Sequence, residues 1–352
     1  MRIMHKYKRL IMILLVTGSA TAIVGILAIR ALHLNDRPFS RTLLPVSATI
    51  IKTMKKHEKI HGIAGTDGSQ IYFSTKNPEH LISTDYNTTD WSVHKTPFKA
   101  TKKSLHNFNF IIDSLSIQLL AGNEAALYIG NMNDTLVEKF TVTPGLFTQG
   151  IKTPSGSYIF RAFDPRLKSI DQVFLKVHPY KGILYKNEHV TPLRDDAGIS
   201  TDGMLHFDDR YGNIVYVSYY TNHIYLLDTS LQLLLKTKTI DNTELIPAFT
   251  GRVGNAEKSR ITNIAPKRII NARSHIADGE LFIESRLKSD SESSTAFSEN
   301  VIIDRYQLKD FKYKNSFYIP DYNKQTLNQF QIIDGKLVVL YQYDVVIYDI
   351  PI

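Results

Sequence analysis

The 352-residue sequence predicts an all-β fold, a six-bladed β-propeller preceded by one N-terminal transmembrane helix. The first observation is a single long apolar run near the N-terminus. The second is a pattern that occurs six times, in which a Gly-containing turn precedes a short strand rich in Ile, Val, Leu, Tyr and Phe. The third is that further short strands flank most of these units. Strand, turn, strand, loop and strand at a period of about 50 residues are typical of propeller blades.

The N-terminal segment combines positive charge with an apolar run. Residues 1–9 form a basic tail with four Lys or Arg residues, and Leu10–Ile29 has no charged residue over twenty positions. As a helix this run is about 30 Å long, the thickness of the hydrocarbon core of a bilayer. The positive charge in front of it predicts a cytoplasmic N-terminus. The sequence thus predicts that the protein contacts a membrane through Leu10–Ile29.

Residues 10–30 allow two interpretations, an uncleaved anchor or a cleaved signal peptide with its cleavage site at Ala20-Thr21-Ala22. The apolar run continues for seven residues past that site, which favours the anchor. The sequence contains no cysteine, which excludes disulfides, thiolate metal ligands and a lipid-bearing cysteine. An exported chain without disulfides fits a bacterial inner membrane, with the propeller in the periplasm.

The positive charge of the chain is concentrated at its N-terminus. Residues 1–37 hold six Lys or Arg and one Asp, a net charge of +5, which leaves +3 of the total +8 for residues 38–352. A nearly neutral body has no net electrostatic attraction for a polyanion. We therefore expect no nucleic acid among its partners.

Residues 31–59 are expected to link the anchor to the propeller. Ser47 can cap a short helix over Ala48–Lys59, with apolar residues on one side and lysines mostly on the other, in solvent or at the membrane surface. A closing strand of the propeller is the alternative. Two polar loops, Asn242–Arg268 with a net charge of +3 and the Ser-rich Lys288–Ser298, interrupt the fifth unit.

Residues 60–352 are predicted to form the six blades. The glycines of the six units are spaced 54, 34, 56, 67 and 56 residues apart and are Gly68, Gly122, Gly156, Gly212, Gly279 and Gly335. Glycine is favoured there because two-residue hairpin turns require positive φ. The short second interval leaves the second and third blades poorly delimited. A pair of β-sandwiches is the alternative fold.

This repeat architecture, together with the block Thr201–Asn222, resembles the six-bladed propellers of the TolB-like and NHL-like kind, in particular anchored or exported versions from Bacteroidota envelopes. The resemblance covers about 290 residues. Such propellers include lactonases, cyclases, receptors and scaffolds, so the resemblance implies a fold but no single activity.

The residues His57-Glu58-Lys59-Ile60-His61 match the H-E-x-x-H pattern of zinc peptidases. On a helix, His57 and His61 would face a zinc ion while Glu58 activates a water molecule. The extended form of the motif needs a glycine where Ala64 stands, and no third histidine follows at the required spacing. The same residues are also consistent with entry into a first strand at Ile60, so we expect no metal there.

Candidate binding residues cluster in one block of the fourth unit. Polar and aromatic residues at strand ends can form the rim of a binding face, and these are Asp208, Arg210, Tyr219, Tyr220 and Asn222. Turn chemistry and packing between blades is the structural alternative. Arg161 and Arg273, near strands, can point into the central channel or form ion pairs within a blade.

The sequence therefore predicts an envelope-facing, membrane-anchored propeller that acts as a non-catalytic binding or scaffolding module. Its partner is expected to be a protein or a small ligand of the envelope, and no cofactor is expected. The alternative is a metal-dependent hydrolase, with either a lactonase-like site of inner-strand carboxylates and amides or zinc at His57 and His61.

Overall fold

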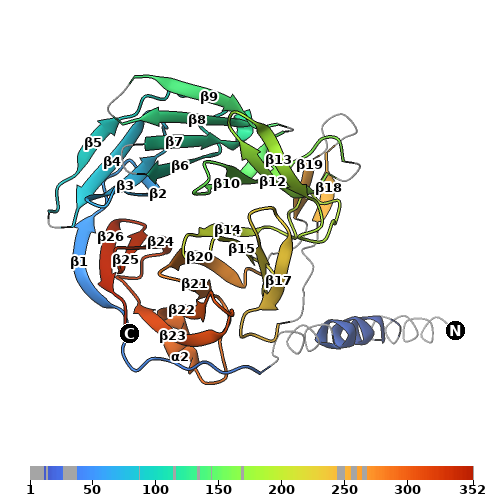
Figure 1. Ribbon diagram of the computed structural model, residues 1–352. Helices are drawn as coiled ribbons and strands as arrows, with labels where there is room; N and C mark the ends of the chain where they lie inside the picture. Colours follow the sequence, from blue (N-terminus) through green and yellow to red (C-terminus); the bar gives the residue numbers. More distant parts are fainter. Residues whose placement is uncertain are drawn as a thin grey trace, which may run out of the picture.

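The computed structural model describes residues 12, 15–26, 38–86, 88–113, 116–132, 135–143, 145–167, 170–243, 250–254, 260–263 and 268–351. Within these residues the chain forms six four-stranded antiparallel sheets and one two-stranded sheet. The six larger sheets surround a central axis (Figure 1). The predicted six-bladed propeller is confirmed, and the alternative pair of β-sandwiches is excluded.

Each blade runs from an innermost to an outermost strand. Blade 1 contains β2 (Ile60–Thr66), β3 (Gln70–Thr75), β4 (His80–Asp85) and β5 (Ser92–Lys95). Blade 2 contains β6 (Phe108–Asp113), β7 (Ser116–Ala121), β8 (Ala126–Asn131) and β9 (Val137–Thr141), with the 3-10 turn η1 (Gly122–Glu124) after β7. Blade 3 contains β10 (Phe147–Lys152), β11 (Tyr158–Phe163), β12 (Gln172–His178) and β13 (Gly182–Asn187).

The second half of the ring carries the insertions. Blade 4 contains β14 (Gly203–Asp208), β15 (Asn213–Ser218), β16 (His223–Leu227) and β17 (Leu233–Lys238). Blade 5 contains β20 (Asn271–Ala277), β21 (Glu280–Ser285), β22 (Asn300–Gln307) and β23 (Tyr313–Pro320), with α2 (Ser294–Ser298) before β22. Blade 6 contains β24 (Leu327–Ile333), β25 (Lys336–Tyr341), β26 (Asp344–Asp349) and β1 (Thr49–Lys55). The two-stranded sheet pairs β18 (Thr250–Val253) with β19 (Arg260–Asn263), inside the predicted Asn242–Arg268 loop.

The blades pack through their apolar faces. The innermost strands β2, β6, β10, β14, β20 and β24 contact one another in that order, and β24 contacts β2. In the described part of the chain, an apolar cluster lies between each pair of neighbouring blades. Between blades 3 and 4, for example, Phe174 meets Tyr216 edge to face with ring centroids 5.1 Å apart. Burial on both faces explains why β-branched and aromatic residues dominate the inner strands.

A strand from near the N-terminus closes the ring. β1 pairs antiparallel with β26, beginning with Thr49 opposite Asp349, and Figure 1 shows this early strand beside the last ones. The predicted helix over Ala48–Lys59 is wrong, and the alternative closing strand is confirmed. The edge of β26 offers a ladder of backbone hydrogen bonds, whereas a short isolated helix is marginal in water. The ring thus begins inside the segment that was expected to be a linker.

Five of the six predicted glycine turns lie between the first and second strands of a blade. In blades 5 and 6 they are two-residue turns in which both residues have positive φ, 53° and 77° at Asp278 and Gly279 and 50° and 71° at Asp334 and Gly335. These are the values of type I′ turns. Gly122 differs, because it begins η1 between the second and third strands of blade 2. This displacement explains the irregular 34-residue spacing.

The N-terminal segment is described only in part. Residues 15–26 are helical (Figure 1). Among the residues that the structure describes, no helix is both long enough and apolar enough to cross a membrane. The predicted basic tail, residues 1–9, and both ends of the 10–30 run lie outside the described residues.

Residues 38–48, the N-terminal strap, lie along the outermost strand of blade 5. The backbone nitrogen of Leu44 donates to the carbonyl oxygen of Ser316 at 2.8 Å, and that of Ala48 donates to Tyr318 at 2.9 Å. The strap covers part of the edge of β23, which would otherwise expose unpaired backbone groups. It therefore attaches the N-terminal segment to blade 5 before the chain enters blade 6.

Arg41 anchors this strap in the interior of blade 5. Its side chain is fully buried, with Nε 2.7 Å from Oδ1 of Asp304 and Nη1 2.6 Å from Oε2 of Glu292. Further hydrogen bonds run to the Ser285 hydroxyl and the Leu287 carbonyl oxygen. Burial lowers the pKa of Arg41, but the two carboxylates raise it further, so the net shift is upward. Arg41 is a buried cation with two carboxylate partners.

Candidate functional site

The predicted binding residues of blade 4 lie on two different faces of the ring. The turn between β14 and β15 lies at the mouth face, where the first two strands of the blades connect. The turn between β15 and β16 lies at the opposite end, the loop face. Asp208 and Arg210 belong to the mouth face, whereas Tyr219, Tyr220 and Asn222 belong to the loop face. These five residues do not form one rim.

Asp208 and Arg210 shape the mouth face. Asp208 is buried, its Oδ1 accepts a hydrogen bond from the backbone nitrogen of Arg210, and burial raises its pKa. Arg210 extends to the neighbouring blade, where its Nη1 donates to the carbonyl oxygen of Asp278 at 2.9 Å. Asp208 thus stabilises a turn, and Arg210 joins the turns of blades 4 and 5.

The loop-face residues hold the crossing from blade 4 to blade 5. The carbonyl oxygen of Tyr219 accepts from the backbone nitrogen of Ile270, and Nδ2 of Asn222 donates to the carbonyl oxygen of Asp241. Tyr220 is buried, and burial, with the nearby Asp202, raises the pKa of Tyr219 to about 12. These contacts support the alternative interpretation, in which the three residues stabilise loops and pack between blades.

Arg273 and Arg161 have different environments. Arg273 on β20 lies 2.6 Å from Glu284 on β21, so the expected ion pair within a blade is confirmed. Arg161 neither points into the channel nor forms an ion pair within the described residues, so both expectations for it are wrong. Its guanidinium lies between blades 3 and 4, 4.9 Å from the ring centroid of Phe174 and 5.4 Å from that of Tyr216.

A cavity of about 500 Å³ opens at the mouth face, at the centre of the ring. The innermost strands of all six blades contribute to it. Its apolar wall includes Ile111, Ile112, Ile151, Phe207, Ile276 and Ile332. Its polar groups include Asn109, Lys152, His206, Asp209, His275, Gln331 and Asp334. A cavity in which apolar side chains stand beside several convergent polar groups is typical of small-ligand sites.

Two histidines in this cavity are neutral at pH 7. Burial lowers the pKa of His206 to about 3 and that of His275 to about 4, and the nearby His275 contributes to the lower pKa of His206. Nδ1 of His275 accepts from the backbone nitrogen of Ile332 at 3.2 Å, so this ring carries its proton on Nε2. Nε2 of His206 lies 2.7 Å from the Ser274 hydroxyl. Both imidazoles are therefore uncharged polar groups in the wall of the channel.

The position of these channel residues relative to the blade turns identifies them in the sequence. His206, His275 and Gln331 each stand three positions before the first residue of a turn between the first two strands of a blade. Equivalent positions in a propeller face the axis at the same depth. Aligning the blades on these turns would have placed all three in the cavity.

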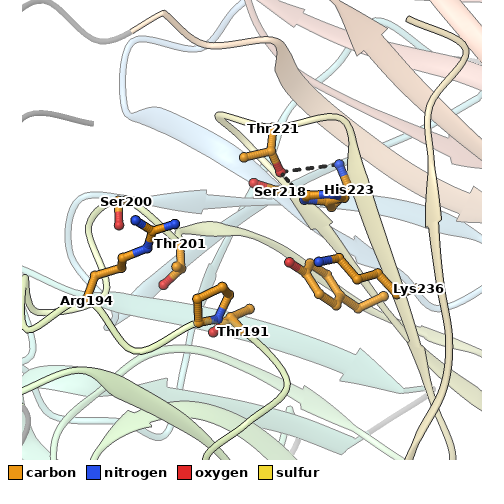
Figure 2. A pocket seen from close by; sticks show the side chains of 10 residues that line it. Thr191, Arg194, Ser200, Thr201, Ser218, Thr221, His223 and Lys236 are labelled. Carbon is orange, nitrogen blue, oxygen red and sulfur yellow. Dashed lines mark hydrogen bonds between the residues drawn. The ribbon is translucent and has the colours of Figure 1, made fainter. Parts of the chain in front are cut away.

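A second, smaller pocket lies at the loop face between blades 3 and 4. This blade 3–4 pocket has a volume of about 200 Å³. Figure 2 shows Arg194 and Ser200, from the loop between β13 and β14, on one side of it and Thr221, His223 and Lys236 of blade 4 on the other. Burial and the lysines of β17 lower the pKa of His223 to about 4. The lining residues include two cationic side chains and five hydroxyl-bearing Ser and Thr residues.

The H-E-x-x-H pattern does not lie on a helix. His61 is on β2, whereas His57 precedes that strand and its Nδ1 accepts from the backbone nitrogen of Lys59. The helical context that the zinc interpretation required is therefore wrong, and the alternative strand beginning at Ile60 is confirmed. Across the described residues, no three His, Cys, Asp or Glu side chains come together as a metal site.

No family model and no curated protein matches the chain. Among solved structures, a member of the DUF4221 family from Bacteroides vulgatus has a TM-score of 0.55 at 10% identity and covers 86% of this chain and 97% of its own. A streptogramin B lyase has a TM-score of 0.48 at 11% identity, covering 89% and 97%. A protein of unknown function from Bacteroides caccae has a TM-score of 0.42 at 11% identity, covering 80% and 92%. The chain is similar to these proteins in fold, and identities this low support no statement on activity.

Proposed function

We propose that this protein is a non-catalytic binding module that takes a small ligand, or a short segment of a partner protein, into the mouth of its central channel. The observation that supports this proposal is the cavity of about 500 Å³ to which all six blades contribute. A rigid ring fixes the positions of its polar groups, so little conformational freedom is lost on binding.

The chemistry of the cavity favours an uncharged or zwitterionic ligand with an apolar part. The isoleucines and Phe207 offer an apolar surface, while Asn109, Gln331 and the neutral His275 offer directional hydrogen bonds. A ligand with matching donors and acceptors should bind these groups more tightly, because an unmatched polar group would be desolvated without compensation.

Native mass spectrometry of the full chain with a small-molecule extract of the envelope tests the channel site. We expect a stoichiometric adduct with the wild type. The adduct should be lost in Gln331→Trp, which fills the cavity, and kept in Asn328→Trp, which changes an exposed side chain of the same strand outside the cavity lining. An adduct that survives Gln331→Trp, or no adduct with any variant, contradicts the proposal.

The proposal includes attachment to a bacterial inner membrane through Leu10–Ile29, with the ring in the periplasm. The uncharged run of twenty residues and the basic tail in front of it support this location. Carbonate extraction and protease accessibility of spheroplasts test it. The chain should remain in the membrane pellet and be digested from outside. A chain released in soluble form, shortened after Ala22, indicates a cleaved signal peptide instead.

A further inference from the structure

The residues that line the blade 3–4 pocket carry positive charge and no negative charge, and the buried carboxylate of Asp241 lies near His223 behind this lining. None of the ten lining residues is acidic, and Arg194 and Lys236 both point toward the pocket (Figure 2). Neither side chain forms an ion pair in the described part of the chain. On β17, Lys238 stands two residues beyond Lys236, pairs with His223 across the sheet and adds to the same positive field.

A third cation lies behind the pocket. Arg161 is 0% exposed, and its Nη2 donates to the hydroxyl of Thr201, which lines the pocket, at 2.9 Å. Its other contacts are the carbonyl oxygens of Gln172 and Thr201 and two aromatic rings. Its buried Nε has no hydrogen-bond partner among the described residues. A buried cation without a carboxylate is costly, so the surroundings favour the approach of an anion.

The walls of the pocket provide hydroxyl donors. Thr191, Thr201, Ser218 and Thr221 line it. Ser200 adds a buried Oγ that has no hydrogen-bond partner in the described residues. A tetrahedral oxyanion accepts hydrogen bonds from several directions at once, which suits a ring of hydroxyl groups and cations better than a neutral ligand does.

The loop that carries Arg194 and Ser200 is preformed. The carboxylate of Asp171 accepts four backbone N–H groups between Arg194 and Gly198, at distances of 2.6 to 3.2 Å. This places one face of the pocket before any ligand arrives and limits the entropy lost on binding. The volume of about 200 Å³ corresponds to roughly six or seven water molecules, enough for one oxyanion group and a few attached atoms.

We propose that the blade 3–4 pocket binds a small tetrahedral oxyanion, phosphate or sulfate, either free or as the terminal group of a small ester. Arg194 and Lys236 hold the anion from opposite sides, the hydroxyls complete its hydrogen bonds, and Arg161 contributes its charge from behind Thr201. This site lies on the loop face and is independent of the channel mouth, so either proposal can fail alone.

Isothermal titration calorimetry on the full chain tests the site, with sodium phosphate, sodium sulfate and glucose 6-phosphate as probes and sodium chloride to hold ionic strength constant. We expect one saturable site for at least one tetrahedral oxyanion. Arg194→Gln and Lys236→Gln should each weaken binding about tenfold or more, because each removes a charge-assisted hydrogen bond. Tighter binding of the sugar phosphate identifies an esterified ligand, and equal or weaker binding identifies the free anion.

Lys95→Gln is the matched control, because Lys95 is exposed on the outermost strand of blade 1 as Lys236 is on that of blade 4. It should leave binding unchanged. Arg194 and Lys236 are also exposed, so their replacements should keep the circular dichroism and unfolding midpoint of the wild type. The absence of saturable binding, or binding that is as strong in both pocket variants as in the control, overturns the proposal.

Discussion

Two buried arginines, Arg41 in the N-terminal strap and Arg161 on β11, are held by the protein in different ways. Arg41 contacts two buried carboxylates, those of Asp304 and Glu292, at 2.7 and 2.6 Å. Arg161 is held by carbonyl and hydroxyl oxygens and by two aromatic rings, with one nitrogen left without a partner in the described residues. Arg41 belongs to the strap and fixes it to blade 5, whereas Arg161 lies beside the blade 3–4 pocket.

The difference separates a charge that is neutralised within the protein from one that the proposed anion would help to neutralise. Arg41 and its two carboxylates form a network whose charges compensate one another, so it needs nothing from outside the chain. The charge of Arg161 is compensated only in part, and the pocket beside it adds two further cations. A buried charge without a counter-ion costs free energy of folding, and such a cost is commonly found where a protein binds something.

The largest expected loss of stability follows from replacing Arg41, the cation with two carboxylate partners. Arg41→Met leaves Asp304 and Glu292 buried without their counter-ion, which typically costs about 3–5 kcal/mol. Urea unfolding should show this loss in the free energy of unfolding. Lys312→Gln, in an exposed pair with Asp310, is the control and should change little. A loss for Arg41→Met as small as that of the control would mean that the strap contributes little to stability.

The channel histidines differ from the two buried arginines, because a histidine can lose its charge on burial. Because the pKa values of His206 and His275 lie near 3 and 4, the unfolded chain binds more protons than the folded one below about pH 6.5. Stability should therefore fall as the pH falls from about 6.5 to about 4, by about 1.4 kcal/mol per pH unit for each histidine. Unfolding of His275→Gln measured across this range should show a shallower slope, and an unchanged slope would contradict the assignment.

Arg273 is intermediate between Arg41 and Arg161 in the expected loss of stability on replacement. It is partly exposed, and its partner Glu284 also lies 2.6 Å from Arg286. Arg273→Met should therefore cost less than Arg41→Met, about 1–2 kcal/mol, because Glu284 keeps one cation. The double variant Arg273→Met with Arg286→Met should cost more than the sum of the two single variants. Simple additivity in that cycle would show that the two arginines do not share Glu284.

The smallest effect on the free protein is expected at Arg161. Arg161→Met removes a buried charge that has no carboxylate partner and keeps the packing against Phe174 and Tyr216, so the free energy of unfolding should change by about 1 kcal/mol or less. The same variant should lose most of the stabilisation that sulfate or phosphate gives to the wild type. A loss as large as that of Arg41→Met would show that Arg161 is structural.

Much of the fold could be predicted from the sequence, because turn glycines and β-branched strands are local signals. Gly279 and Gly335 mark type I′ turns that any two-residue hairpin requires. The closing strand could not be predicted with the same ease, because β1 is a strand only through its pairing with β26, about 300 residues away. Its local pattern of apolar residues and lysines is equally compatible with a helix.

The candidate sites were harder to predict, because they depend on which blades meet. Asp208 and Asn222 are close in sequence but lie at opposite ends of β15. Arg161 and Arg194 come from β11 and from the loop after β13, and both lie beside blade 4 because these consecutive blades pack face to face. His206 and His275 could have been found by aligning the blades on their turns, since both occupy the same inner-strand position.

Titration of His223 by NMR tests most directly whether the uncompensated charge at Arg161 marks a binding site. The pKa of His223 is about 4 in the free protein, mainly through burial and through Lys236 and Lys238. An anion bound beside this imidazole stabilises its protonated form. Saturating sulfate or phosphate should therefore raise that pKa by about one pH unit or more at constant ionic strength. A pKa that stays at its free value under these conditions contradicts the account.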